Sequence, residues 1–161
     1  MPTNWIMIQL LVMKVYLGAD HGGYELKEEL KKYLTTLRYE VEDMGARSLD
    51  PNDDYTDFII PVAKKVASTL DNLGIIFGRS GNGEVIAANK INGIRAVLCL
   101  NEKMAEKAKD HNNANILSLG ADYISLEDAK KIVQKFLETP FSNEERHVRR
   151  LKKIEEIEKS N

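Results

Sequence analysis

Short apolar runs alternate with longer amphipathic segments along this chain. The short runs predict buried strands, and the longer segments, in which apolar residues recur at helical spacing, predict helices. The predicted strands cover residues 14–17, 39–44, 74–77, 94–98 and 116–119. The predicted helices cover residues 24–37, 57–70, 84–90, 103–110 and 126–138. This strict alternation is typical of parallel βαβ units, so we expect an α/β fold with an open, doubly wound sheet.

The polarity of such a sheet determines where functional residues are expected. Right-handed crossovers place every loop that leads from a strand into a helix along one edge, and ligands bind at that edge. After Pro140, the charged segment 144–159 predicts a last helix that packs outside the sheet or against a partner.

Length and composition predict a single domain, because 161 residues with 43% hydrophobic side chains can bury one substantial core. We expect an N-terminal appendage over residues 1–12, the domain over residues 13–143, and a C-terminal helical segment over residues 144–161 that completes the site or a dimer. The apolar run 5–17 is shorter than the roughly 20 residues that a membrane helix needs. It also lacks the basic lead-in and the cleavage site of a secretory signal.

Charge and cysteine content narrow the class of protein. The 23 Lys and Arg residues against 25 Asp and Glu residues leave a net charge of -2, so no general attraction to nucleic acid or to membranes is expected. Any anion site must be local. The single cysteine, Cys99, cannot form an internal disulfide or a multi-cysteine zinc site, which favours a reducing, cytoplasmic location.

The loop after the first predicted strand contains Asp20 and His21 among glycines. Aspartate commonly caps the N-terminus of a helix, so capping is the ordinary structural explanation of Asp20. The imidazole of His21 adds a titratable group at the expected ligand-binding edge of the sheet. The first loop is therefore a candidate part of a site.

The loop after the third predicted strand, residues 78–84, reads Gly-Arg-Ser-Gly-Asn-Gly-Glu. Its glycines let the backbone turn sharply and present N–H groups, and the following helix adds the positive end of its dipole. This favours an anion cradle, either for a phosphate or for the oxyanion of an enediolate. The glycine order differs from the Walker loop and from the dinucleotide fingerprint. Glu84 has an ordinary explanation as a first-turn carboxylate.

The three histidines of the chain all lie in segments with other candidate groups. One lies in the first loop, His111 ends a predicted helix beside Asn112, and His147 follows Arg146. Helical spacing places Arg146, His147 and Arg150 on adjoining faces, and clustered guanidinium groups suit a phosphate. The ordinary explanation of His111 is a favourable interaction with the helix dipole. The ordinary explanation of the basic cluster is a solvated helix face. No histidine has metal-ligand spacing with a neighbouring Cys or carboxylate, so no metal is expected.

Five motifs occur in a specific order. They are Gly18-Ala-Asp20-His21-Gly22-Gly23, Ser80-Gly81-Asn82-Gly83-Glu84 with Ile86-Ala87-Ala88-Asn89-Lys90, Gly93-Ile94-Arg95-Ala96, His111-Asn112 and Arg146-His147-Val148-Arg149-Arg150. Together they resemble the type B ribose-5-phosphate isomerases, a family that also includes galactose-6-phosphate isomerase subunits. The resemblance runs from about Met13 to Ile157, which is nearly the whole chain.

The resemblance implies interconversion of ribose 5-phosphate and ribulose 5-phosphate in the pentose phosphate pathway, without a metal or an organic cofactor. It also implies a three-layer α/β/α Rossmann-like sandwich, in a homodimer or homotetramer with the active site at the subunit interface. Members of the family remove the C2 proton with a cysteine just after the third strand or with a glutamate later in the loop. Here Gly78 stands at the cysteine position and Glu84 at the glutamate position, so Glu84 is the expected base. Cys99, in the fourth predicted strand, is expected to be a buried core residue.

Roles for the other matched residues follow from the same resemblance. Asp20 and His111 would open the furanose ring, and Glu84 would then move the proton between C2 and C1. The Ser80 hydroxyl and the N–H groups of residues 81–83 would hold the enediolate. The remaining residues assigned to substrate binding are His21, Arg146 and Arg150 for the phosphate, Gly81, Asn82 and Gly83 in the cradle, and Tyr55, Asn112 and His147 near the substrate.

The sequence departs from the family pattern at two charged positions. Asp122 stands where the family usually has a phosphate-binding arginine, and Arg79 replaces a common glycine; we hypothesise that Arg79 supplies the missing charge. The alternatives are a hexose 6-phosphate isomerase acting on galactose or allose 6-phosphate, and a sugar-phosphate-binding protein without turnover, which Asp122 motivates. A nucleotide-binding module that uses Glu42 or Asp43 is a third, against which the glycine order argues.

Overall fold

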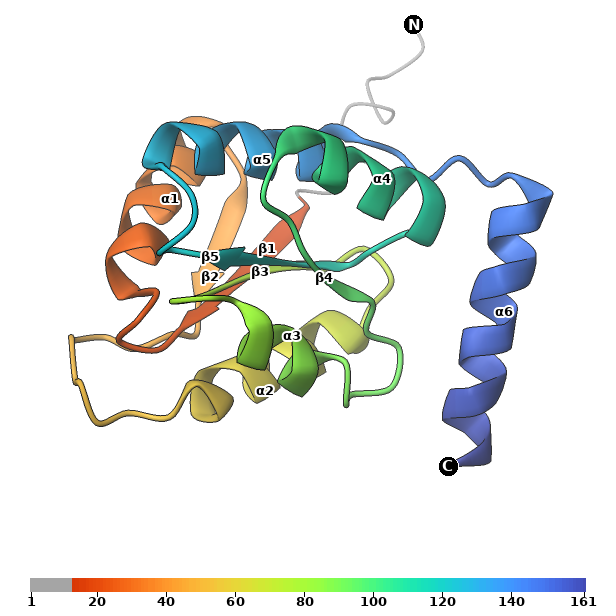
Figure 1. The fold of residues 1–161 in the computed structure, drawn as a ribbon, viewed down its shortest axis with the longest axis horizontal. Helices are drawn as coiled ribbons and strands as arrows, with labels where there is room; N and C mark the ends of the chain where they lie inside the picture. Colours follow the sequence, from red (N-terminus) through yellow and green to blue (C-terminus); the bar gives the residue numbers. More distant parts are fainter. Residues whose placement is uncertain (1–12) are drawn as a thin grey trace, which may run out of the picture.

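The computed structural model describes residues 13–161 and contains a five-stranded parallel sheet of order β2-β1-β3-β5-β4 (Figure 1). The strands are β1 (Lys14–Ala19), β2 (Glu40–Asp43), β3 (Leu73–Gly78), β4 (Ala96–Leu98) and β5 (Ile116–Gly120). The helices are α1 (Tyr24–Thr36), α2 (Tyr55–Ala67), α3 (Asn82–Ala88), α4 (Glu102–Asn112), α5 (Leu126–Glu138) and α6 (Glu145–Ser160). The predicted appendage, residues 1–12, lies outside the described residues.

Two helical layers cover the sheet, which confirms the three-layer α/β/α fold. Helices α1, α4 and α5 pack on one face, and α2 and α3 pack on the other (Figure 1). Alternate side chains of each strand enter opposite layers: Val15 and Leu17 of β1 join one core cluster, and Tyr16 joins the other. The central strands are apolar along their length because both of their faces are buried.

Helix α2 begins two residues earlier and ends three residues earlier than predicted, at Tyr55–Ala67. The backbone N–H of Asp57 donates to the carbonyl of Asp54 at 3.1 Å, so the first turn forms before the predicted start. At the other end, the hydroxyl of Ser68 donates to a carbonyl of the last turn at 2.6 Å. Leu70 lies beyond the helix with a fully exposed side chain. Local hydrogen bonds thus override the apolar pattern at both ends.

The fourth strand is shorter than predicted and begins at Ala96. The backbone N–H of Arg95 donates to the side-chain oxygen of Asn115 at 2.7 Å instead of joining the sheet ladder. The strand ends at Leu98, so Cys99 lies just after it rather than in it. Its side chain is nevertheless buried, at 1% exposed, which confirms its place in the core. Burial raises the pKa of its thiol to about 12, so the thiolate is disfavoured.

Helix α6 is attached to the edge of the sheet at which the strands begin, away from the arrowheads in Figure 1. The carboxylate of Glu158 accepts the backbone N–H of Gly93 at 3.0 and 3.1 Å. The backbone carbonyl of Glu158 accepts the side-chain amide of Asn92 at 3.3 Å. Both partners precede β4, so these contacts fix α6 at the amino edge. No helix among residues 13–161 is long and apolar enough to cross a membrane.

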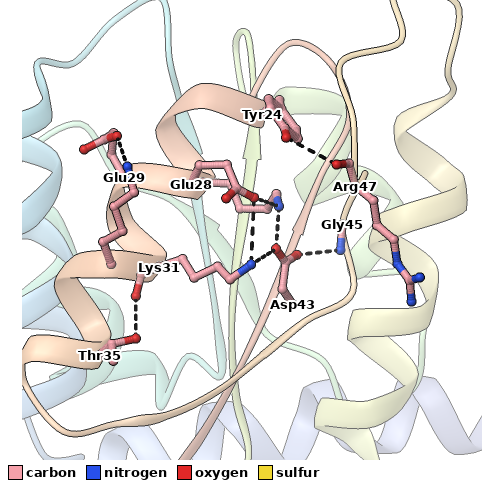
Figure 2. A network of polar contacts seen from close by, with 10 residues as sticks. Tyr24, Glu28, Glu29, Lys31, Thr35, Asp43, Gly45 and Arg47 are labelled. Atoms are coloured by element: carbon pink, nitrogen blue, oxygen red, sulfur yellow. Dashed lines mark hydrogen bonds and ion pairs between the residues drawn. The ribbon is translucent and has the colours of Figure 1, made fainter.

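A network of polar contacts that includes a buried lysine joins α1 to the end of β2, and Figure 2 shows Lys31 and Asp43 of this network. The side chain of Lys27 is fully buried, and its Nζ donates to Asp43 Oδ2 at 2.6 Å and to Glu28 Oε1 at 2.7 Å. Lys31 Nζ donates to the same Asp43 oxygen at 2.9 Å. Asp43 Oδ1 accepts the backbone N–H of Gly45, also at 2.9 Å. The network therefore fixes the start of the loop that leads from β2 to α2.

Replacing Lys27 by methionine should lower the free energy of unfolding by about 2–4 kcal/mol, because Asp43 would keep a largely buried charge with one fewer partner. Lys31→Met is the matched control. Its ammonium contacts the same oxygen from a half-exposed position, so its loss should cost less than about 1 kcal/mol. Urea unfolding followed by circular dichroism measures both. Equal losses in the two variants would contradict a special role for the buried lysine.

Candidate active site

Three loops that leave the carboxyl ends of neighbouring strands meet at one edge of the sheet. They follow β1, β2 and β3, which lie side by side in the strand order. The first contains Asp20 and His21, the second leads through Asp53 into Tyr55, and the third runs into Glu84 in the first turn of α3. The fold thus brings these segments together as the polarity of a parallel sheet requires.

The carboxylate of Glu84 occupies the space beside Gly78. Glu84 is buried, at 5% exposed, and a Cβ atom built on Gly78 would overlap its carboxylate. Burial raises the pKa of Glu84, and the negative charge of Asp20 raises it further, while a backbone hydrogen bond at Glu84 acts in the opposite direction. A raised pKa makes the carboxylate a stronger base, which suits a group that takes up and returns a proton.

The glycine-rich turn before α3 contains a glycine in the left-handed conformation. Gly81 has φ +81°, in the left-handed region that favours glycine. Its carbonyl accepts the hydroxyl of buried Ser118 at 2.9 Å, which fixes the turn from the sheet side. Ser80 Oγ accepts the backbone N–H of Asn82 at 3.2 Å. A Cβ at Gly83 would lie 2.8 Å from Tyr55 Cζ, so the tyrosine ring packs against the turn.

Asp20 and His21 share a small polar cluster with Asp53. Asp20 is buried, at 8% exposed, and its Oδ1 accepts the backbone N–H of Gly22 at 2.9 Å. Its Oδ2 lies 3.8 Å from His21 Nδ1. That ring nitrogen lies 2.6 Å from Asp53 Oδ1, which also accepts the backbone N–H of His21 at 3.1 Å.

Asp53 is absent from the site residues that the sequence predicts. Its position after the second strand, at the same edge as the other loops, is the feature of the sequence that could have identified it. Side-chain ligand atoms of Asp20, His21 and Asp53 lie within 4.8 Å of one another, so the fold creates a three-residue set that local spacing did not reveal. The imidazole–carboxylate hydrogen bond already accounts for the closeness of His21 and Asp53.

Five predicted residues lie at the opposite edge of the sheet from Glu84. Helix α4 runs back from the end of β4, so His111 and Asn112 in its last turn lie near the start of β5. The His111 and His147 rings are 4.4 Å apart, which places α6 with Arg146 and Arg150 in the same region. One copy of the chain therefore does not bring all the predicted site residues together.

The residues of this second cluster differ in exposure. His147 is buried, at 3% exposed, and its Nδ1 lies 2.9 Å from Ser142 Oγ. Burial lowers the pKa of His147, and the neighbouring His111 lowers it further. Arg146 and Arg150 are exposed, and Arg146 Nε donates to Glu144 Oε2 at 2.8 Å. In this cluster, Arg146 is thus paired with a carboxylate of the same turn, and burial favours the neutral form of the His147 imidazole.

Arg79 and Asp122 lie together beside His21. Arg79 Nη1 is 3.8 Å from Asp122 Oδ1, and both side chains are more than half exposed. They line a pocket of about 600 Å³ together with His21, Gly22 and Pro51. Asp122 stands where the resemblance implies an arginine, and Arg79 stands where it implies a glycine. The two side chains thus face each other.

The carboxylates considered for a nucleotide ribose are already paired. Glu42 Oε2 accepts Lys14 Nζ at 2.7 Å, and Asp43 accepts the two lysines of α1 described above. Hydrogen bonds from these lysines lower the pKa of Asp43 although burial acts in the opposite direction. This pairing argues against a nucleotide-binding role for either residue.

Comparison with known proteins gives consistent matches over nearly the whole chain. A family model described as Ribose/Galactose Isomerase matches residues 15–154. A protein from Mycobacterium tuberculosis named ribose-5-phosphate isomerase B is 42% identical over 148 residues, 92% of this chain and 91% of that protein. The crystal structure of ribose-5-phosphate isomerase B from Mycoplasma genitalium with bound ribulose 5-phosphate has a TM-score of 0.89 at 39% identity, covering 92% of this chain and 97% of that one. A ribose 5-phosphate isomerase from Thermotoga maritima is similar at 44% identity and a TM-score of 0.85, covering 89% and 98%.

Proposed function

Because the chain belongs to the ribose/galactose isomerase family, we propose that it interconverts ribose 5-phosphate and ribulose 5-phosphate. The observation that carries the proposal is the buried carboxylate of Glu84 against Gly78, beside a glycine-rich turn in which Gly81 has a left-handed conformation. We further propose that the chain acts in the cytoplasm, in the pentose phosphate pathway.

Ring opening comes first, since only the open-chain aldehyde can isomerise. A proton must leave the sugar hydroxyl on C1, and another must reach the ring oxygen. Asp20 can accept the first, because its Oδ2 makes no strong hydrogen bond to another described residue. His111 is the proposed donor of the second. The C1–O bond to the ring then breaks, and the aldehyde forms at C1.

Glu84 then transfers a proton between C2 and C1. Its carboxylate removes the C2 proton, and the bonding electrons move to give an enediolate with negative charge on O1. Ser80 can pass a proton between O2 and O1, and Glu84 returns its proton to C1 to complete the ketose. The raised pKa of Glu84 favours this return, because its protonated form is not strongly acidic.

The turn before α3 is the proposed oxyanion site. Its backbone N–H groups are held in place by the Ser118 contact and by the left-handed conformation of Gly81. Donors fixed before the reaction stabilise developing charge without the cost of reorganisation. The negative charge of the enediolate is thus offset next to the base that generates it.

We also propose that two copies of the chain share each active site, in a homodimer or homotetramer. The support is the separation of His111 and Arg150 from Glu84 across the sheet. A second copy placed against the carboxyl edge could supply these groups to the first. The phosphate would then be bound by His21 of one copy and by Arg146 and Arg150 of the other.

Glu84→Gln should lower kcat for ribose 5-phosphate by roughly 10²- to 10⁴-fold while the fold remains intact, because the amide cannot accept the C2 proton. Glu102→Gln is the matched control, since Glu102 is a first-turn glutamate of α4 that is exposed. Turnover is measured by ribulose 5-phosphate formation with no metal added. Near-wild-type turnover of Glu84→Gln would overturn the proposed mechanism.

Mixed oligomers test the shared site. Co-refolding equal amounts of inactive Glu84→Gln and His111→Ala chains should restore about a quarter of wild-type activity, because half of the dimers contain both chains and each of these has one intact site. Mixing Glu84→Gln with Asp20→Asn should restore nothing, since both changes lie at the same edge. No recovery in the first mixture would place His111 and Glu84 in one subunit, and recovery in the second would place Asp20 and Glu84 in different subunits.

Arg79→Gly should raise KM for ribose 5-phosphate by about three- to tenfold with a smaller effect on kcat, because a cation is lost from the pocket. Asp122→Asn should have the opposite effect on KM, since it frees Arg79 from its partner. Steady-state kinetics on phosphorylated pentoses and hexoses measure both variants. A KM that does not change in Arg79→Gly would show that Arg79 does not compensate for Asp122.

A further inference from the structure

We propose that Asp53 is a positioning residue that holds His21 as an imidazolium with its Nε2–H available to the anionic group of the substrate. The proposal rests on the proposed function, because it concerns how the phosphosugar is bound. Asp53 itself need not touch the substrate. Its effect is transmitted through the ring of His21.

The geometry fixes both the backbone and the ring of His21. One oxygen, Asp53 Oδ1, accepts the backbone N–H at 3.1 Å and lies 2.6 Å from Nδ1 of the ring. A carboxylate at this distance requires a proton on Nδ1. No group among residues 13–161 makes a hydrogen bond to Nε2, and the side chain is 28% exposed in the pocket wall. The free nitrogen is therefore the one that can meet a ligand.

Burial of Asp53 makes this hydrogen bond energetically important. The side chain is only 10% exposed, and its Oδ2 is buried with no hydrogen-bond partner among residues 13–161. A buried carboxylate is costly unless a nearby positive charge compensates it. A protonated His21 supplies that charge at 2.6 Å. Neutral His21 would leave the carboxylate with hydrogen bonds from neutral donors alone.

The other charges around His21 come from the three loops and from α1. Asp20 lies at 3.8 Å from Nδ1, Arg79 faces the ring from the loop after β3, and Glu25 and Asp122 line the same pocket. The hydrogen bond to Asp53 is the largest influence and raises the pKa of His21, and Asp20 raises it further. Burial and Arg79 lower it. The net result favours the cation, which persists to higher pH than in an ordinary histidine.

An imidazolium so held is a good partner for a phosphate. It donates a charge-assisted hydrogen bond from Nε2, and its orientation is fixed before the ligand arrives, which lowers the entropic cost of binding. Its contribution should be lost as pH rises through the raised pKa of His21, because the neutral ring has its only proton on Nδ1.

The direct test is a titration of the histidine rings by NMR in the wild type and in Asp53→Asn. His21→Gln assigns the His21 signal among the three histidines. The titration midpoint of His21 should fall in Asp53→Asn and stay at the wild-type value in Asp54→Asn. Asp54 is the matched control, an exposed neighbour whose side chain makes no capping hydrogen bond. An unchanged midpoint in Asp53→Asn would overturn the proposal.

A second measurement separates electrostatic positioning from a purely structural effect. KM for ribose 5-phosphate in Asp53→Asn should exceed the wild-type value by about tenfold at a pH between the two His21 titration midpoints, where the ring is charged only in the wild type. It should approach the wild-type value at a pH below both midpoints, where the ring is charged in both proteins. A ratio of KM values that is equal at every pH would indicate structural damage only and would also overturn the proposal.

Inorganic phosphate distinguishes the failure of this inference from the failure of the proposed function. Its dissociation constant, measured calorimetrically on intact wild type and Asp53→Asn, should show the same pH-dependent ratio without any turnover. Absence of ribose 5-phosphate turnover in the wild type, together with the expected phosphate binding, would contradict the isomerase function alone. Normal turnover with identical phosphate binding by both proteins at all pH values would contradict the role of Asp53 alone.

Discussion

The common direction of the five strands is the constraint on which the rest of the structure depends. It collects every strand-to-helix loop at one edge, and so places Asp20, Asp53 and Glu84 together although they are distant in sequence. The same constraint sends His111 to the other edge, because a helix that follows a parallel strand must run back. The fold therefore brings together only some of the predicted site residues in one chain, and the proposed self-association would complete the set.

The buried carboxylates at this edge of the sheet differ in the positive charges that surround them. Glu84 has no cationic partner among residues 13–161, and burial raises its pKa, which strengthens its carboxylate as a base. Asp53 is compensated by His21, and Asp43 by two lysines of α1. The last two carboxylates lie at the two ends of one loop, between β2 and α2. That loop is consequently attached at its start to α1 and at its end to the loop after β1.

Most of the fold was accessible from the sequence because strand and helix periodicities are local properties. All five strands and six helices were predicted, with errors of two or three residues at ends of β1, α2, α3, β4 and α4. At α2 and β4, side chains such as Ser68 and Asn115 bond the backbone. The polar contacts between loops were not accessible in the same way. The Asp53–His21 and Lys27–Asp43 pairs join residues whose separation reflects topology, and no spacing rule identifies them. The proximity of Arg79 to Asp122 could not be predicted from spacing either. Each residue is identifiable from the sequence as a departure from the family pattern, but their contact is not.

The contact between Gly78 and Glu84 also bears on which side chains position 78 can carry. A Cβ atom there would overlap the Glu84 carboxylate, which is the far end of a flexible side chain. A residue other than glycine at position 78 would therefore require this carboxylate to leave its buried place, while the strand that carries position 78 could stay where it is. Under the proposed mechanism, a substitution at position 78 would thus change the location of the base before it changed the sheet.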